Sequence, residues 1–510
     1  MGRSLTSAFL SIFSARIATT AVTLVTLPII VRVLGPDSYG DYAFLLSVFA
    51  IVMTFVSSGV TEGVQKYVGE DREAAWREHV VGFYLRLAVA LAVVGALGTA
   101  AFALFGPVER LLDARFRTYF LLLGAFMFAA QLRSFVRRSL MGMELERYTE
   151  PLRVAYAISW VTIGLLLATA GWGVAGLLVG NIVACLAIAA VGGVLLARRL
   201  SIRETLSATP RSFPRDELLW FNALNIVLVL LMKSLYNVDV VMLRTLGGSE
   251  MTGHYKSALV IAEYLWFVPV SLQTVLLHST SGLWAEDRRD RIEALTARIT
   301  RYTLLLTCLL ALGIAALAGR FVPLYYGPAF AEAVTPLRVL LPGVVAFAVV
   351  HPMYAVSQAN GNLKPLVAAT AGSALLNVAL NAALIPAYGM VGAAVATGIG
   401  YGSMLAFHVR SARHLGFDPL ADLRAGRVAL TAGVAAVPVF GATLLLDDLL
   451  ALAVVPPLGF AVYAWTAVAT GAITADELAD LAGALPVSVP ASVRSFASSL
   501  VPHAGEGGRE

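Results

Sequence analysis

One apolar stretch of the chain carries polar side chains that fall close to one face of a helix predicted over 218–243. The members of this stripe are Asn222, Asn225, Lys233, Tyr236 and Asn237. A charge inside a membrane span costs from about 2.5 kcal/mol upward and usually faces a cavity or a partner. The stripe therefore predicts either a wet chamber where Lys233 attracts an anionic group, or a Lys233 paired with a carboxylate that locks helices together.

A second polar face begins at Arg16, in a span predicted over 9–31, and continues with Thr20 and Thr23. Helix rise places Arg16 about 10 Å from the cytoplasmic end of that span. A guanidinium at this depth could bind a phosphate group through two parallel hydrogen bonds. The competing interpretation is that Arg16 extends back to the inner lipid headgroups. We regard both as open from the residues alone.

Four further residues could bind or release a coupling ion, because carboxylates and imidazoles can change charge in a membrane cavity. These candidates are Asp239, Glu263, His278 and His351. Glu263 could instead neutralise a neighbouring cation, and each histidine could be a hydrogen-bonded packing residue. Asn377 and Asn381 lie one turn apart and are expected to form interhelical hydrogen bonds.

Composition excludes an ordinary soluble domain, because 58% of the 510 residues are hydrophobic and only 14% are charged. Long continuous apolar runs favour helices over a membrane β-barrel. The two cysteines, Cys185 and Cys308, lie inside apolar runs and are expected to be packing residues. The sequence contains no nucleotide-binding glycine loop, no metal-ligand spacing and no nucleic-acid-binding basic tract. We therefore expect a non-enzymatic protein without cofactor or metal, in which any coupling ion is unidentified.

Hydropathy predicts an all-α polytopic membrane protein with 14 transmembrane helices. The predicted spans are 9–31, 39–60, 80–105, 116–136, 152–170, 173–197, 218–243, 255–281, 300–319, 335–358, 365–386, 389–409, 428–446 and 449–472. With a cytoplasmic N-terminus, most Lys and Arg residues fall in cytoplasmic segments, as membrane insertion favours. We expect a multi-pass protein of the cell membrane with both termini in the cytoplasm. The interleaved charges of 284–301 predict an amphipathic helix on the inner leaflet.

A repeat relates the two halves of the chain. Two stretches with a shared pattern, differing by one inserted residue, are Arg32-Val-Leu-Gly-Pro-Asp-Ser-Tyr-Gly-Asp-Tyr42 and Arg244-Thr-Leu-Gly-Gly-Ser-Glu-Met-Thr-Gly-His-Tyr255. A second pair is Gly173-Val-Ala-Gly176 and Gly389-Met-Val-Gly392. Two matches at nearly one spacing predict a duplicated helical bundle, which is how many transporters are built. Arg32 and Arg244 are expected to mark external helix ends in a structural role.

The duplication predicts two pseudo-symmetric six-helix bundles plus two C-terminal helices. The corresponding segments are an N-terminal bundle (1–200), a C-terminal bundle (201–425), two additional helices (426–472) and a cytoplasmic tail (473–510). The tail begins with Thr474-Ala-Asp-Glu477, whose spacing is that of a helix capping box.

Several stretches carry a resemblance to a known family. They are Leu27-Pro-Ile-Ile-Val-Arg-Val-Leu-Gly-Pro-Asp-Ser-Tyr-Gly-Asp-Tyr42, Asp239 followed by Leu246-Gly-Gly and Gly253-His-Tyr255, Tyr326-Gly-Pro-Ala-Phe330, Asn377-Val-Ala-Leu-Asn-Ala-Ala-Leu-Ile-Pro-Ala-Tyr-Gly-Met-Val-Gly-Ala-Ala-Val-Ala-Thr397 and Thr474-Ala-Asp-Glu-Leu478. Over about residues 5–480 the sequence resembles the polysaccharide-transport branch of the multidrug/oligosaccharidyl-lipid/polysaccharide exporter superfamily.

The resemblance implies a flippase that moves polyprenyl-phosphate- or diphosphate-linked oligosaccharides outward by alternating access, for surface polysaccharide or glycan biosynthesis. On this interpretation Arg16 and Lys233 attract the phosphate, and the other polar groups accommodate the sugars. The expected partners are the lipid-linked oligosaccharide, membrane lipids and glycan-assembly enzymes.

The nearest alternative is a cation-coupled multidrug antiporter of the same superfamily, whose members usually have 12 spans and a more apolar or acidic pocket. The cationic stripe and the two additional helices argue against it. A membrane-embedded sugar polymerase is the alternative from another class, and it would be expected to have a sizeable external catalytic loop. A structural membrane protein would leave the charges inside the spans unexplained.

Overall fold

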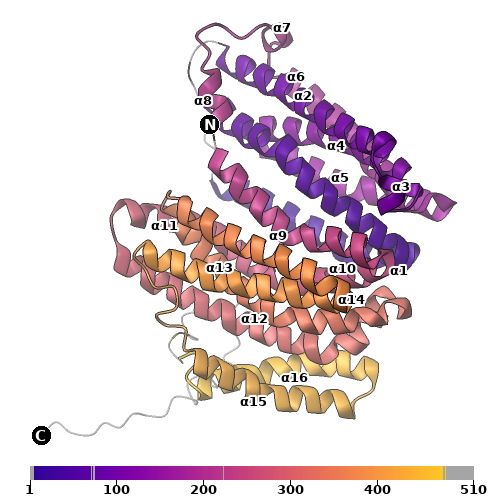
Figure 1. Cartoon of the computed structure of the whole chain (residues 1–510). Helices are drawn as coiled ribbons and strands as arrows, with labels where there is room; N and C mark the ends of the chain where they lie inside the picture. Colours follow the sequence, from indigo (N-terminus) through magenta and orange to yellow (C-terminus); the bar gives the residue numbers. More distant parts are fainter. Residues whose placement is uncertain (1–4, 71, 73–74, 222, 475–476, 478–510) are drawn as a thin grey trace, which may run out of the picture. The chain divides into compact units, whose positions relative to one another are not determined.

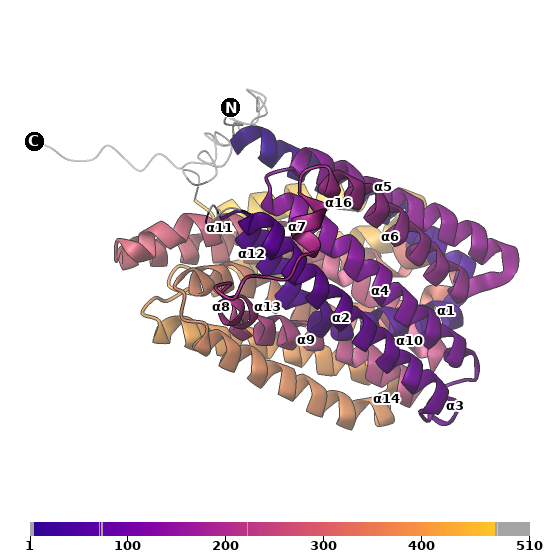
Figure 2. The same ribbon diagram turned by 90° about the horizontal axis from the view of Figure 1, so that it is seen from above.

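The computed structural model describes residues 5–70, 72, 75–221, 223–474 and 477, without the side chains of 5–13, 15–16 and 223–225. Within these ranges the ordered elements are all helices and there is no β-strand. The prediction of an all-α membrane protein is therefore confirmed. Figure 1 labels these helices along the chain, and Figure 2 shows the same ribbon from above.

The helices and their bounds are α1 (Leu5–Val68), α2 (Trp76–Phe105), α3 (Val108–Leu111), α4 (Arg115–Gly142), α5 (Glu146–Leu167), η1 (Ala168–Trp172), α6 (Gly173–Ala197), α7 (Ile202–Leu206), α8 (Arg215–Trp220), α9 (Ala223–Gly247), α10 (Ser249–Glu263), η2 (Tyr264–Trp266), α11 (Phe267–Ala285), α12 (Arg289–Tyr326), η3 (Pro328–Ala333), α13 (Val334–Ala359), α14 (Lys364–His414), α15 (Ala425–Leu445) and α16 (Asp448–Ala469).

In the described ranges, 11 continuous helical stretches are long and apolar enough to cross a membrane. Three of these stretches are broken near the middle by glycines with non-helical torsions, at Gly35 in α1, Gly171 between α5 and α6, and Gly389 in α14. Each broken stretch makes two crossings, so the total agrees with the 14 predicted spans. The predicted break before the last span also holds, because α15 ends at Leu445 and α16 begins at Asp448.

The sequence repeat is visible in the backbone. Gly173 has φ 50° and ψ −126°, and its counterpart Gly389 has φ 55° and ψ −132°. Positive φ also occurs in both long repeat stretches, at Gly35 (69°) and at Gly248 (92°). A residue with a β-carbon adopts these torsions only with strain. The glycines therefore set matching turns in the two copies of the repeat.

The two turns touch each other through backbone alone. A β-carbon on Gly40 would lie 1.9 Å from the Ser249 carbonyl oxygen, and one on Gly253 would lie 2.0 Å from the Pro36 carbonyl oxygen. The contact is reciprocal, because Pro36 precedes Gly40 by the same four positions that separate Ser249 from Gly253. Only glycine allows helices to approach this closely.

The chain divides into two compact units. Unit 1 comprises Met1–Val260, Val322–Val339 and Leu363–Gly400, and unit 2 comprises Ile261–Phe321, Leu340–Asn362 and Tyr401–Glu510. In unit 1 one core cluster joins Val64 of α1, Val80 of α2 and Leu218 of α8. In unit 2 the core includes Leu305 of α12 with Val428 and Tyr463 of the last two helices. The predicted domain boundaries stay a prediction.

The expected surface helix over 284–301 is wrong, because most of it forms the first part of α12. Ile292 is fully buried in a cluster with Val356 and Phe417. Arg301 is also buried and pairs with Asp422 at 3.1 Å and with Glu477. The alternation of charged and apolar residues thus follows packing inside unit 2 rather than a lipid surface.

The capping box predicted at the start of the tail is present. The Glu477 amide donates to Thr474 Oγ1 at 3.3 Å, and the Thr474 amide donates to Glu477 Oε2 at 2.9 Å. These reciprocal bonds satisfy backbone groups at the start of a helical turn. Nearly all of the rest of the tail lies outside the described residues.

Candidate functional site

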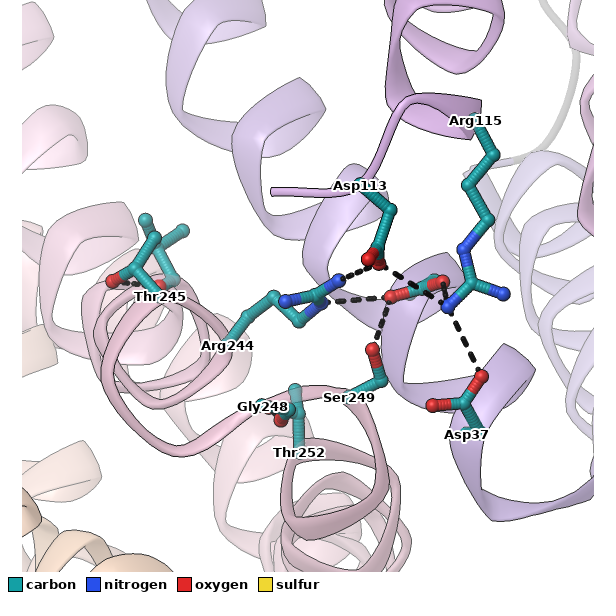
Figure 3. A network of polar contacts seen from close by, with 10 residues as sticks. Asp37, Asp113, Arg115, Arg244, Thr245, Gly248, Ser249 and Thr252 are labelled. Atoms are coloured by element: carbon teal, nitrogen blue, oxygen red, sulfur yellow. Dashed lines mark hydrogen bonds and ion pairs between the residues drawn. The ribbon is translucent and has the colours of Figure 1, made fainter. Parts of the chain in front are cut away.

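An ionic network in unit 1 joins residues that are far apart in the sequence. Arg244, near the end of α9, donates from Nε to Asp41 at 2.7 Å and from Nη2 to Asp113 at 2.9 Å. Arg115, at the start of α4, lies 3.0 Å from Asp41 and 3.1 Å from Asp37. Figure 3 shows Arg244 and Arg115 approaching Asp113 from opposite sides.

The centre of this network is removed from solvent. The side chain of Asp41 is 0% exposed and that of Arg244 is 7% exposed. Ser249 at the start of α10 donates a further bond to Asp41 at 2.8 Å. Removing one partner from a buried ion pair leaves an uncompensated charge, which is strongly destabilising. The network therefore ties Asp41, in the first copy of the repeat, to the second copy.

The polar face predicted on α9 looks toward the segment of α1 that follows the Gly35 break. Two helical turns before Lys233, Ile226 lies 3.2 Å from where a β-carbon on Gly59 would be. Three turns after Lys233, Arg244 bonds Asp41. The face that carries Lys233 thus contacts this α1 segment at both ends.

Between those two contacts the polar residues remain accessible. Lys233 is exposed, and Tyr236 and Asn237 are half-buried. The side-chain amide of Asn237 donates to the backbone carbonyl oxygen of Lys233 at 2.8 Å, a bond within the helix. No carboxylate forms an ion pair with Lys233 among the described residues. Its ammonium group therefore has charge to offer an anion.

The polar face predicted on the first span is described only in part. Thr20 is half-buried and Thr23 is exposed, and Thr23 donates to the Thr19 carbonyl oxygen at 3.0 Å. The side chains of Arg16 and Asn225 lie outside the described part of the structure, as does the whole of Asn222. The role of Arg16 therefore stays a prediction.

Asp239, one of the four coupling candidates, is fully buried in unit 1. Its Oδ2 accepts hydrogen bonds from the Tyr255 hydroxyl and, at 2.9 Å, from Thr397 Oγ1. Its Oδ1 accepts the Val240 amide at 2.7 Å. No lysine or arginine lies within ion-pair distance of Asp239 in the described ranges, and Lys256 acts on its charge from farther away. A buried carboxylate without a cation in direct contact either holds a proton or attracts a cation.

Two amide side chains extend this cluster along α14. Asn377 donates to Thr397 Oγ1 at 3.4 Å, and Asn381 donates to the Asn377 carbonyl oxygen at 2.9 Å. The side-chain oxygens of both asparagines are buried without a hydrogen-bond partner among the described residues. Buried acceptors nearly always have a hydrogen-bond partner, so these two oxygens need an explanation such as a bound water or ion. Carboxylate, hydroxyl and amide oxygens are ligand types that a hard cation prefers.

The other three coupling candidates belong to unit 2. Glu263 is half-buried and His278 is exposed. His351 is buried, with Nδ1 2.7 Å from Gln273 Oε1 and its ring centroid 5.2 Å from that of Phe347. These contacts are those of a hydrogen-bonded packing histidine, the alternative that the sequence left open.

Sequence reasoning omitted most of the ionic network. Asp41 lies in a repeat stretch in which the glycines and the arginine are shared by both copies and the aspartate is not. Asp113 and Arg115 lie in a short connection between spans. A signal was available, because Arg244 follows directly on an apolar run and needs an anionic partner when buried. The sequence contains no sign that this partner would lie 203 positions away.

Comparisons with known proteins bear on the whole chain. Residues 5–275 match the model of the polysaccharide biosynthesis protein family, and residues 154–455 match the model of the lipid II flippase MurJ family. No curated protein matches the sequence.

Solved structures share the fold at low sequence identity. A lipid II flippase MurJ in an inward closed conformation is 15% identical with a TM-score of 0.73, and the match covers 91% of this chain and 98% of that one. An inward-facing multidrug resistance MATE transporter of the MOP superfamily is 16% identical with a TM-score of 0.66, with 78% and 94% covered. An outward-facing MATE transporter is 16% identical with a TM-score of 0.52, with 82% and 96% covered.

Identity this low shows the fold alone, whereas the two family models each match more than half of the chain. The fold and both families are those of membrane transporters. The chain belongs to the polysaccharide biosynthesis protein family, also matches the lipid II flippase MurJ family over more than half of its length, and shares its fold with solved MurJ and MATE structures.

Proposed function

We propose that this protein moves a polyprenyl-phosphate- or diphosphate-linked oligosaccharide from the cytoplasmic to the outer face of the cell membrane. The observation that carries this proposal is Lys233, an exposed cation that forms no ion pair with any described residue, on a face of α9 that contacts α1 at both ends. A cation at the middle of a membrane span is retained where it serves an anionic group. A lipid-linked phosphate supplies that group while its tail stays in the bilayer.

The ionic network fits the role of an outer gate. With the N-terminus in the cytoplasm, α9 runs outward and Arg244 lies three turns beyond Lys233. The network then closes the outer side while Lys233 remains accessible from the cytoplasm. Opening outward would separate Arg244 from Asp41, and buried charges separate only if water or new partners compensate them. The substrate phosphate or a coupling ion supplies that compensation.

The Asp239 cluster fits the role of the coupling site. A cation bound there would neutralise the carboxylate, which is fully buried. Binding of a cation to one conformation shifts the conformational equilibrium toward it. A cation gradient could thus drive a protein that has no nucleotide-binding motif.

The test of the phosphate role is Lys233→Ala in cells that depend on this protein for surface glycan. We expect lipid-linked glycan to accumulate on the cytoplasmic face while the protein remains in the membrane at normal abundance. Lys233→Arg keeps the charge and should retain most transport, and Ser234→Ala is a neighbouring control. Normal surface glycan in the Lys233→Ala strain would contradict the proposal.

The coupling role is tested separately with Asp239→Asn. The unchanged protein should be stabilised against heat by one of H⁺, Na⁺ or another cation, and Asp239→Asn should remove that response. Loss of cation dependence with persistent transport would leave a passive flippase. A Glu150→Gln variant removes another buried carboxylate of unit 1, one that pairs with Arg137 at 3.1 Å, and should keep the response.

A cation-coupled drug antiporter remains the second candidate, because the solved MATE transporters share the fold and Asp239 is a buried acid. Drug export predicts that cells lacking the protein become sensitive to cationic drugs while surface glycan stays normal. Glycan export predicts the reverse pattern.

A further inference from the structure

A second basic and apolar site lies apart from α9, where the segment between α6 and α9 packs on α2. A β-carbon on Gly82 of α2 would lie 2.0 Å from the Thr205 carbonyl oxygen of α7. The Tyr84 hydroxyl donates to the Leu218 carbonyl oxygen of α8 at 3.0 Å. The connecting segment, which contains α7 and α8, therefore packs against α2 within unit 1 (Figure 1 and Figure 2).

A pocket opens between these elements. Phe83, Leu87 and Ala90 of α2 form one wall, and Leu206 and Leu219 lie opposite. Arg86 and Arg215 also line it, and its lining contains no carboxylate. Its volume is about 630 Å³. Its walls therefore combine an apolar slot with two cations.

The two arginines are held in place yet keep free donors. Arg86 donates from Nη1 to the Ser207 carbonyl oxygen at 3.1 Å, and Arg215 donates from Nη2 to Thr209 Oγ1 at 2.7 Å and to the Thr209 carbonyl oxygen at 3.3 Å. A guanidinium has five N–H donors. No ion pair engages Arg86 or Arg215 in the described part of the chain. Their remaining N–H groups can bind a phosphate.

The surroundings of the pocket are those of a membrane interface. Ile202, Leu206 and Trp220 are 59%, 66% and 75% exposed. Large apolar side chains at such exposure, beside arginines, are typical of segments that lie at the level of lipid headgroups. Under the orientation proposed from the charge pattern, this is the inner leaflet, whose anionic lipids attract Arg and Lys.

We propose that this pocket binds an anionic phospholipid of the cytoplasmic leaflet, with its phosphate between Arg86 and Arg215 and an acyl chain along Phe83, Leu87 and Ala90. Charge complementarity selects a phosphate without a compensating cation over a zwitterionic headgroup. The bound lipid would contact α2, α7 and α8 together, and would thereby stabilise the segment that joins the two copies of the repeat. This site is distinct from the one proposed to carry the substrate.

The test measures lipid retention by the purified full-length protein, using native mass spectrometry with phosphatidylglycerol and phosphatidylcholine of identical chains. We expect phosphatidylglycerol to bind more tightly, on the order of tenfold, as two arginines near a headgroup allow. An Arg86→Gln/Arg215→Gln double variant should bind both lipids equally. An Arg203→Gln/Arg211→Gln double variant removes two arginines of the same segment that do not line the pocket, and it should keep the preference.

Equal binding of both lipids by the unchanged protein would overturn the proposal, as would loss of preference in the Arg203/Arg211 control.

A second variant is useful if the Arg86/Arg215 double variant folds poorly. Ala90→Phe fills the apolar wall and keeps both arginines, so it should weaken phosphatidylglycerol binding. Displacement by inorganic pyrophosphate alone would reveal a free phosphate site, which contradicts a lipid. A polyprenyl diphosphate that outcompetes phosphatidylglycerol in the pocket would identify a substrate site instead. Transport by a Lys233→Ala protein plays no part in these outcomes, so the two proposals fail independently.

Discussion

The two copies of the repeat use the same backbone for different contacts. In the first copy Tyr42 bonds Asn181 of α6, and in the second copy Tyr255 bonds Thr397 at the matching position of α14. Among the described residues, only the second pair also meets a buried carboxylate, because Asp239 stands where the first copy has Leu27. The two copies thus share one backbone arrangement, and the change from leucine to aspartate places a buried carboxylate in the second copy.

The repeated arginines diverge in the same way. Arg244 is buried and pairs with Asp41, whereas Arg32 is exposed and donates to the Leu324 carbonyl oxygen. A buried ion pair and a bond from an exposed arginine differ greatly in what their loss costs. The contrast between the copies can therefore be measured.

The largest difference is expected between Arg244→Gln and Arg32→Gln. Arg244→Gln leaves Asp41 buried with less positive charge around it and should cost about 3–5 kcal/mol of stability. Arg32→Gln removes a partly solvated bond and should cost far less. Thermal unfolding of the purified proteins measures both, and equal melting temperatures would refute the distinction drawn between the copies.

An intermediate and symmetrical effect is expected from Gly40→Ala and Gly253→Ala. Each adds a β-carbon about 2 Å from a backbone oxygen, and such overpacking typically costs about 1–3 kcal/mol. Because the contact is reciprocal, the two single variants should lose similar stability and the double variant should lose less than their sum. Gly98→Ala is the control, since its β-carbon would meet nothing within 4 Å. Unequal losses would mean that the contact is not shared evenly.

The smallest effect is expected from Tyr42→Phe and Tyr255→Phe, each of which removes one hydroxyl. Tyr42 loses its bond to Asn181, whereas Tyr255 loses its bonds to Asp239 and Thr397. At about 1 kcal/mol for each hydrogen bond, Tyr255→Phe should lower the melting temperature more than Tyr42→Phe. Only Tyr255→Phe touches Asp239 and should also weaken stabilisation by the coupling cation. The same cation response in both variants would argue that the Asp239 cluster binds no ion.

The sequence predicted what depends on local pattern. Apolar run length predicted the crossings, and glycine punctuation predicted the breaks at Gly171 and Gly389, because both follow from short-range physics. Asp239 stood out as a polar residue near the end of an apolar run. The hydrogen-bond partners of Asp239 could not be predicted, because Tyr255 and Thr397 come from other helices.

What escaped prediction depends on tertiary packing. Asp41 looks like a turn residue until Arg244 and Arg115 are placed beside it. From the sequence, Asn377 is expected to form hydrogen bonds between helices, whereas in the structure its side-chain oxygen has no donor among the described residues. The start of α12 has the charge pattern of a surface helix, and only the burial of Ile292 and Arg301 shows otherwise.

The crossing of Gly40 and Gly253 has a mechanical consequence. No side chain lies between the two backbones there, so no rotamer has to change when one helix rotates against the other. Side chains interlocked elsewhere along the same helices must disengage before they can slide. We therefore expect this point to act as a pivot, around which Asp41 and Arg244 move apart while the two glycines stay in contact.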